Sequence, residues 1–185
     1  MKKILLGIII IAAIVILSTI GVYNNIVAKN EMITASWAQI ENQLQRRNDL
    51  IPNLVNSVKG YAAHEKGVFE AVTQARSQWA KASNIDEKVK AAGAIDAALS
   101  RLLFVAENYP NLKTDQTFLK LMDELSGTEN RIAVERMRYN AAVRDYNITV
   151  RTFPGNIIAK SFNYKVATEY FKADEGAKAV PKVSF

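Results

Sequence analysis

The histidine and acidic side chains of this chain, the residue types most used in metal and acid–base chemistry, do not combine into a catalytic set. His64 is the only histidine among 185 residues, and Glu65 follows it. A zinc-binding His-Glu-x-x-His motif would need a second histidine where Val68 stands. A di-iron bundle would need Glu-x-x-His on two helices, which one histidine cannot supply. His64 is therefore expected in a turn, where it or Glu65 helps to begin a helix.

Two acidic pairs, Asp86-Glu87 and Asp123-Glu124, are adjacent in sequence, so on a helix their side chains point about 100° apart. They are poorly placed for shared acid–base chemistry and are interpreted as solvated or first-turn charges. The chain also has no cysteine, no glycine-rich phosphate loop and no nucleophile elbow. We therefore predict that it is not an enzyme and that it has no catalytic, cofactor-binding or metal-binding residues.

The sequence predicts two long helices, each with a stripe of apolar residues along one face, and charged side chains interrupt both stripes. Arg47 falls in one stripe, and Glu129 and Arg136 fall in the other. If the two helices are antiparallel, the middle of one meets the middle of the other, which would place Arg47 beside Glu129. Because a buried charge needs a partner, we interpret these two residues as an internal ion pair that fixes helix register. The floor of a ligand or partner site is the alternative.

A group of polar residues surrounds Pro52, which cannot donate a hydrogen bond to the carbonyl of Asn48. The helix is expected to kink or to open locally over residues 48–53. Asparagine amides there can satisfy the freed carbonyls, or the group can recognise a ligand. The residues predicted to form an interaction or structural polar cluster are Arg46, Arg47, Asp49, Asn53, Glu129 and Arg131.

The elements that carry these residues are helices, because apolar positions recur every three or four residues along most of the chain. The first long stripe is Ile33, Trp37, Ile40, Leu44, Ile51, Leu54, Val58 and Tyr61. The last is Phe118, Met122, Leu125, Ile132, Tyr139, Val143, Tyr146, Val150 and Phe153. Between them lie two shorter stripes, Val68, Val72, Ala75 and Trp79, then Val89, Ala92, Leu99, Leu102 and Ala106.

Helix boundaries follow from capping and breaking residues. Ser83 or Asn84 is expected to cap the third helical stretch, and residues 108–111, which include Pro110, are expected to end it. Thr114 or Asp115 is expected to cap the last long helix, and residues 154–155, Pro-Gly, to stop it.

No stretch alternates with period two, and the linkers are short. The fold is therefore predicted to be all-α, an N-terminal transmembrane helix followed by an antiparallel up-and-down four-helix bundle. A three-rod version, with the second and third stretches stacked end to end, is the alternative. The one internal repetition is a Tyr-Asn pair, which occurs at Tyr139-Asn140 and again at Tyr146-Asn147, seven residues later on the same helix face.

The N-terminal segment is predicted to span a membrane. Ile4–Val22 is a run of nineteen residues without a charge, which as a helix would extend about 28 Å, close to the thickness of a hydrocarbon core. The run is longer than the apolar region of a cleaved signal peptide, and no small-x-small site follows it, which favours an uncleaved anchor over a removed signal. The predicted division is an anchor (1–25), a helical bundle (26–172) and a flexible C-terminal tail (173–185).

Charge indicates the topology. Lys2 and Lys3 precede the span, whereas Lys29 after it is offset by Glu31. The positive-inside rule then predicts a single-pass protein of the cell (inner) membrane, with a cytoplasmic N-terminus and an extracytoplasmic bundle. The net charge of +6 is mild and dispersed, so no nucleic-acid partner is expected. The predicted partners are the lipid bilayer, through Ile4–Val22, and envelope proteins; the oligomeric state stays open.

Longer motifs occur along the whole chain: Arg46-Arg47-Asn48-Asp49-Leu50-Ile51-Pro52-Asn53-Leu54-Val55, Tyr61-Ala62-Ala63-His64-Glu65, Glu107-Asn108-Tyr109-Pro110, Thr128-Glu129-Asn130-Arg131-Ile132, Arg138-Tyr139-Asn140, Asp145-Tyr146-Asn147 and Pro181-Lys182-Val183-Ser184-Phe185. In these motifs the chain resembles the LemA family of bacterial membrane-anchored proteins. The resemblance implies a short anchor and a four-helix up-and-down bundle. It also implies an envelope protein without an assigned enzymatic activity, in a family of which some members help to organise specialised membranes.

The function expected from these features is a non-enzymatic, membrane-anchored scaffold or adaptor for envelope partners, which acts by raising a partner's effective concentration near the membrane. The alternative is an envelope sensor or carrier that binds a small ligand or an anionic polymer between its helices. A cavity lined by Arg47, Asn53 and Asn140, in place of a filled core, would favour this alternative. The C-terminal Val183-Ser184-Phe185 is expected either to be read by a groove or to fold back onto the bundle.

Overall fold

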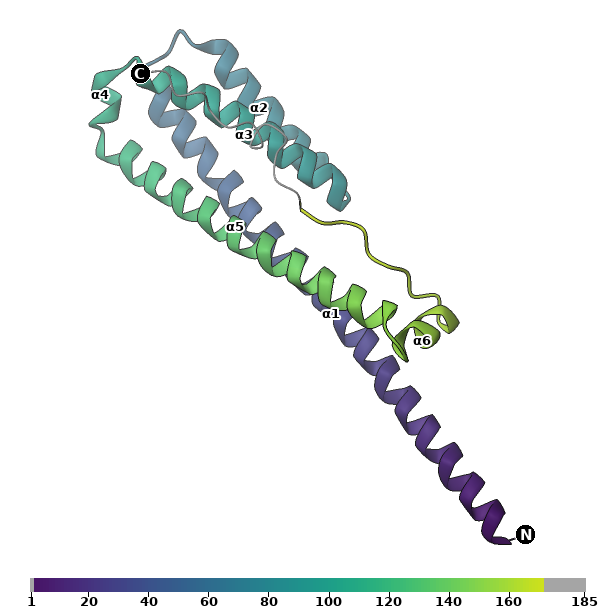
Figure 1. Cartoon of the computed structure of the whole chain (residues 1–185). Coiled ribbons are helices and arrows are strands. Elements are labelled where there is room, and N and C mark those ends of the chain that lie inside the picture. Colours follow the sequence, from purple (N-terminus) through teal and green to yellow (C-terminus); the bar gives the residue numbers. More distant parts are fainter. Residues whose placement is uncertain (1, 172–185) are drawn as a thin grey trace, which may run out of the picture. The chain divides into compact units, whose positions relative to one another are not determined.

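The computed structural model describes residues 2–171, and every regular element in that range is a helix. In chain order these are α1 (Lys2–Lys59), α2 (Lys66–Lys81), α3 (Ile85–Glu107), α4 (Pro110–Lys113), α5 (Gln116–Arg151) and α6 (Gly155–Ser161) (Figure 1). The all-α prediction is confirmed for this part of the chain. The predicted tail, 173–185, lies outside the described residues.

The chain divides into two compact units. Unit 1 contains Met1–Ile40 and Val134–Phe185, and unit 2 contains Glu41–Ala133. The helices α1 and α5 each contribute one segment to each unit.

Helix α1 contains the apolar run Ile4–Val22 and continues through the predicted boundary at residue 25 without a break. The apolar side chains of the run are exposed, as in Ile10 and Leu17, and the helix is long and apolar enough to cross a membrane. The predicted local opening around Pro52 is not found, because residues 48–53 are helical throughout.

In unit 2 the segment of α1 from Glu41 packs with α2, α3, α4 and the beginning of α5 around one apolar core. Helices α2 and α3 lie side by side (Figure 1). The core residues contributed by the predicted stripes are Leu44, Ile51, Leu54, Val58, Val72, Ala75, Trp79, Ala92, Leu99, Leu102, Ala106, Phe118 and Ile132. Two stripe positions were predicted wrongly: Val89 is 39% exposed and Tyr61 is 41% exposed. Both lie near a helix end, where the neighbouring helices no longer cover the apolar face.

Capping residues set the helix starts in unit 2. The side chain of Asn84 accepts a hydrogen bond from the backbone N–H of Glu87, whose carboxylate in turn accepts one from the N–H of Ser83. The first bond satisfies a donor that the first turn of α3 leaves free, and the second satisfies the N–H of the residue before the cap. Asp115 accepts from the N–H of Phe118 at the start of α5. Pro110 begins α4, a single turn that the sequence patterns did not predict.

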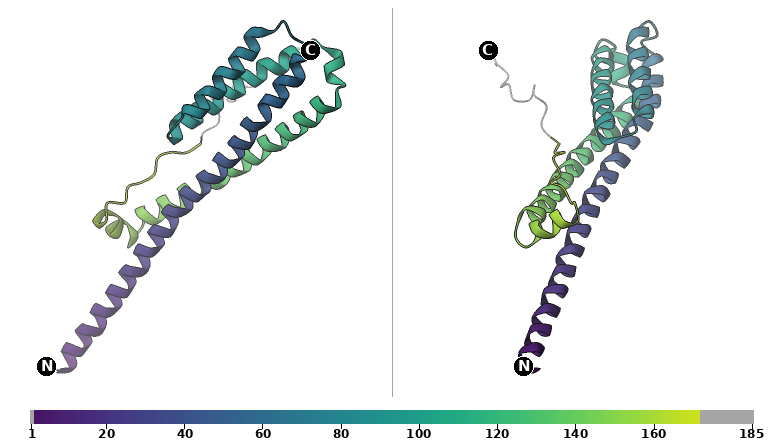
Figure 2. Two further views of the ribbon diagram at one scale, coloured as in Figure 1. Left: turned by 180° about the vertical axis from the view of Figure 1, so that it is seen from behind. Right: turned by 90° about the vertical axis from the view of Figure 1, so that its right-hand side faces the viewer.

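In unit 1 the first part of α1 and the second part of α5 run antiparallel. Ile26 shares a cluster with Tyr146 and Val150, whereas Trp37, eleven residues later in α1, contacts Tyr139, which comes earlier in α5. Helix α6 packs on the same cluster through Ile158, and the chain then continues without regular structure from residue 162 to residue 171 (Figure 2).

Phe153 was predicted as the last core position of the long stripe, and this prediction is wrong: its side chain is 80% exposed. Helix α5 ends at Arg151, two residues earlier, so the helical spacing no longer determines where Phe153 points. The chain then turns through Pro154 into α6. Helix α6 is the second short helix that the sequence patterns missed.

Gly155 permits the turn between α5 and α6. A Cβ atom at this position would lie 2.0 Å from the backbone oxygen of Thr149. No side chain fits at that distance from a backbone atom, so any other residue must push α6 away from α5.

We predict that Gly155→Ala destabilises this corner by about 1–3 kcal/mol, because the methyl group overlaps the end of α5. The readout is faster hydrogen exchange in α6 and a lower thermal midpoint of the full chain in detergent. Gly93→Ala is the control. A Cβ there meets nothing within 4 Å, and alanine favours the helix by up to about 1 kcal/mol. Unchanged exchange in α6 of the Gly155 variant would contradict the prediction.

Candidate functional site

A buried arginine joins three helices of unit 2. The guanidinium Nη1 of Arg47, on α1, lies 2.5 Å from Oε2 of Glu129 on α5 and 2.7 Å from Oδ1 of Asp96 on α3. Its Nη2 donates a hydrogen bond to the backbone oxygen of Ala92, at 3.5 Å. Arg47 is 2% exposed, so its charge is neutralised by protein groups and only slightly by water.

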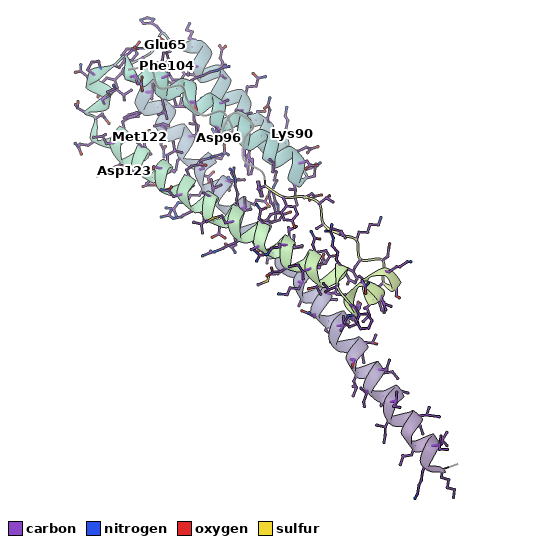
Figure 3. All side chains as sticks on the ribbon, in the orientation of Figure 1. Glu65, Lys90, Asp96, Phe104, Met122 and Asp123 are labelled. Atoms are coloured by element: carbon purple, nitrogen blue, oxygen red, sulfur yellow. The ribbon has the colours of Figure 1, made fainter. Side chains whose placement is uncertain are left out.

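The two carboxylates are half-exposed, at 46% for Asp96 and 51% for Glu129. Water therefore reaches the carboxylates of Asp96 and Glu129 but hardly reaches the guanidinium of Arg47. Figure 3 labels Asp96 on α3. The arrangement places one buried positive charge against two solvated negative charges, which costs less desolvation than burying both signs.

The contact between Arg47 and Glu129 is the one expected from antiparallel packing. The other four predicted cluster residues, Arg46, Asp49, Asn53 and Arg131, are exposed and do not join it. Asp49 accepts a hydrogen bond from Gln45 on its own helix. Asn53 lines an open cavity of about 390 Å³ together with Tyr61 and Asp115.

Sequence reasoning missed Asp96, the third member of the cluster. A weak signal was present, because Asp96 lies next to Ile95 and four residues after Ala92, both on the buried side of α3. An acidic residue at the edge of an apolar face is also common on solvated helices. The signal becomes specific only when α3 is known to pack beside Arg47.

Two further polar contacts hold α2 against α1. Arg76 donates from Nε to the side-chain oxygen of Asn48 at 3.3 Å, and the indole N–H of Trp79 donates to Gln45 at 3.2 Å. The donors are three residues apart on α2, and the acceptors are three apart on α1, so each pair comes from one helix face. The buried polar group of Asn48 is thus satisfied within the protein.

In unit 1 two asparagines of α5 hold the extended segment 164–171, which we call the strap. Asn140 donates from Nδ2 to the carbonyl of Phe171 and accepts from its N–H, both at 2.9 Å. Asn147 makes the same pair of bonds with Ala167, at 2.7 and 2.9 Å. Each side-chain amide therefore replaces the partner strand that an extended backbone would otherwise need.

The spacing of the two asparagines fits the strap. Seven residues of helix rise about 10.5 Å, and the four residues from Ala167 to Phe171 span at most about 13 Å when fully extended. A short turn, in which the N–H of Tyr170 donates to the oxygen of Thr168, takes up the difference. The phenol of Tyr146 fixes the beginning of the strap by donating to the oxygen of Lys165 at 2.8 Å.

Phe171 is the aromatic end of the strap. Its ring stacks on Trp37 with centroids 5.9 Å apart and meets Tyr139 edge-on at 5.4 Å. The guanidinium carbon of Arg136 lies 5.3 Å from the Phe171 ring centre, within cation–π range. The sequence did contain a signal for this site, the repeated Tyr-Asn pairs at 139–140 and 146–147, although it did not say what they bind.

Hydrogen bonds and burial shift the pKa values of several described groups. The hydrogen bond from the Phe118 N–H lowers the pKa of Asp115, and the hydrogen bond from Tyr61 to that carboxylate raises the pKa of the Tyr61 phenol. Burial raises the pKa of Tyr146. The pKa of the Asp115 carboxyl is lower in the folded chain than in the unfolded chain. Its contribution to folding stability is therefore fully present above its unfolded-state pKa and is lost as the pH falls through its folded-state pKa. No group of three or more His, Asp or Glu residues within 2–171 is placed to hold a metal ion.

The fold and these sites define an all-helical protein with one long apolar N-terminal helix and a body held by an internal arginine cluster and an asparagine-bound strap. Residues 36–185 match the model of the LemA family, and the chain belongs to that family.

Curated relatives are about 30% identical to this chain over the aligned residues. The magnetosome protein MamQ 2 of Paramagnetospirillum magneticum is 31% identical, over 81% of this chain and 64% of that protein. MamQ of Magnetospirillum gryphiswaldense is 28% identical, over 80% and 64%. Protein LemA of Metamycoplasma hominis is 32% identical, over 80% and 67%. The chain thus spans less than two thirds of the length of its MamQ relatives.

We predict that Arg47→Ala lowers the free energy of unfolding by an amount near the lower end of the roughly 3–5 kcal/mol typical of a broken buried ion pair. The two carboxylates left behind are half-exposed, which limits the cost. Urea denaturation of the full chain measures the effect. Arg46→Ala is the matched control, since Arg46 is exposed and its loss should change stability by no more than about 0.5 kcal/mol. Equal stability of the two variants would exclude the cluster as a structural element.

We predict that Asn140→Ala frees the end of the strap, because two hydrogen bonds worth about 0.5–1.5 kcal/mol each are lost. Hydrogen exchange at the amide of Phe171 should accelerate about tenfold or more, since each 1.4 kcal/mol is a factor of ten. The exposed Asn130 of the same helix provides the control variant, Asn130→Ala. Equal hydrogen exchange at Phe171 in both variants would show that the side chain of Asn140 does not hold the strap.

Proposed function

We propose that this chain is a non-enzymatic scaffold anchored in the cell membrane by Ile4–Val22, and that it holds partner proteins close to the bilayer. Its body is an antiparallel, up-and-down helical bundle that provides the binding surface. The N-terminus lies in the cytoplasm, and the body lies on the extracytoplasmic side.

The observation that carries the proposal is the continuity of α1. The apolar run and the segments of α1 in both units belong to one helix, Lys2–Lys59, with no linker between them. An anchor that continues without a linker into unit 1 limits the orientations that unit 1 can adopt, which suits a protein that positions partners more than one that searches for diffusing substrates.

The state of the polar groups favours a scaffold over a ligand carrier. A carrier was expected to line a cavity with Arg47, Asn53 and Asn140. The guanidinium of Arg47 is bound by Asp96 and Glu129, and the amide of Asn140 is bound by the backbone of Phe171. Two of the three groups named for a carrier, the guanidinium of Arg47 and the amide of Asn140, therefore already have partners within the chain.

The relatives support the same reading. Family membership covers residues 36–185, and two of the proteins described above carry names that assign them to the magnetosome. A scaffold that works at a membrane is consistent with those names. The partners of the relatives are not transferred, because the chain spans only 64% of their length.

Topology is the first test. The chain has no cysteine, so Ser83→Cys, in the exposed loop between α2 and α3, provides a single reactive thiol. A membrane-impermeant maleimide should label it in intact cells. Labelling only after lysis would place the body in the cytoplasm and overturn the extracytoplasmic part of the proposal.

Scaffolding is tested by its effect on a partner. A photo-crosslinking residue in place of Phe104, which is 69% exposed on α3 and labelled in Figure 3, should trap a defined protein in the membrane fraction. Removal of the chain, or replacement of residues 1–25 by a cleaved signal, should release that protein from the membrane. An unchanged distribution of the trapped protein would reject the scaffold.

A further inference from the structure

We propose that the corner between α5 and α6 in unit 1, residues 151–165, is a second membrane contact, and that it inserts Phe153, Ile157 and Phe162 into the bilayer interface beside the anchor. The inference rests on the proposed function in one respect, because it takes Ile4–Val22 to span the membrane. The occupant of this surface is lipid.

The packing of unit 1 places the corner at the level where the span ends. Tyr23 follows directly after Val22, and its ring lies 4.7 Å from that of Phe162 and 6.2 Å from that of Tyr164, measured between centroids. Val22 and Tyr23 also pack against the cluster that contains Ile158 of α6. Because α5 runs antiparallel to α1, its C-terminal end points toward the apolar run (Figure 2).

The corner presents three large apolar side chains that are more than half exposed. Phe153 is 80% exposed, and Ile157 and Phe162 are each 57% exposed. On the opposite face of α6, Ile158 and Ala159 are buried against α1 and α5. A short helix with one face on the protein, an exposed isoleucine, and an exposed phenylalanine before it and after it resembles an interfacial element, and aromatic rings favour the depth of the headgroups.

The charges of the corner match a lipid surface. Arg151, Lys160 and Lys165 are exposed, and the sequence contains no acidic residue from Tyr146 to Thr168. Basic side chains that flank an inserted apolar group can reach the phosphates of anionic lipids. A surface that contacts a soluble protein would not need three exposed basic residues beside the end of an apolar span.

The test uses the full chain in vesicles of phosphatidylcholine and phosphatidylglycerol. Because the chain has no cysteine, an environment-sensitive fluorophore can be attached at one site at a time. The variants are Phe153→Cys and Ile157→Cys in the corner, Ile16→Cys in the span and Met137→Cys on α5. Met137 is 65% exposed and belongs to the same unit, but it lies fourteen residues, about 21 Å along the helix, before the end of α5 at Arg151.

Lipids with a nitroxide just below the headgroup should quench the fluorophore at 153 and at 157 by about half, as expected for an interfacial position, and should leave the one at 137 unquenched. Lipids with a nitroxide deep in the acyl chain should quench only the fluorophore at position 16. If position 16 is quenched but 153 and 157 are not, the corner does not touch lipid and this inference fails alone. If position 16 is not quenched either, the anchor and the proposed function fail with it. A blue shift at 153 without quenching by lipid would mean that a second copy or another protein covers the surface, which also overturns the inference.

Discussion

The structure depends on the continuity of α1, a single helix whose surroundings change along its length. Its first segment exposes the apolar run Ile4–Val22, its second packs against α5 and α6, and its third carries Arg47. This is possible because a helix satisfies its own backbone hydrogen bonds in lipid, in a protein core and in water alike. The side chains alone therefore have to change with the environment, and the helix needs no break between its exposed apolar segment and its packed segments.

Arg47, on the third segment of α1, restricts how the helices of unit 2 can align with one another. Its guanidinium has one geometry in which it reaches Asp96, Glu129 and the oxygen of Ala92 together. A shift of α3 or α5 by one turn, about 5.4 Å, would leave the buried charge without a carboxylate. Apolar contacts alone tolerate such shifts better, because one aliphatic side chain can replace another. The ion cluster thus selects one register among several that the apolar stripes permit.

The sequence predicted the parts of the structure that repeat with the helical period, and it missed those that do not. The stripes of α1 and α5, the cap at Asn84 and the approach of Arg47 to Glu129 all follow from spacing along one or two helices. Asp96 was missed because its partner comes from a third helix. Phe153 was misplaced because α5 ends at Arg151, and the stripe was extended past that end. The strap was missed because backbone recognition by side-chain amides leaves no apolar periodicity.

The two asparagines show why a spacing of seven residues was nevertheless informative. On a helix, residues seven apart share a face, and an amide side chain can both donate and accept. Repeated Tyr-Asn pairs therefore create a row of peptide-like groups on α5, each beside a ring that packs in the core of unit 1. Such a row can pair only with a chain that exposes its own backbone. The strap meets that condition because residues 164–171 form no helix, and the asparagines compensate the backbone groups that it would otherwise leave unpaired.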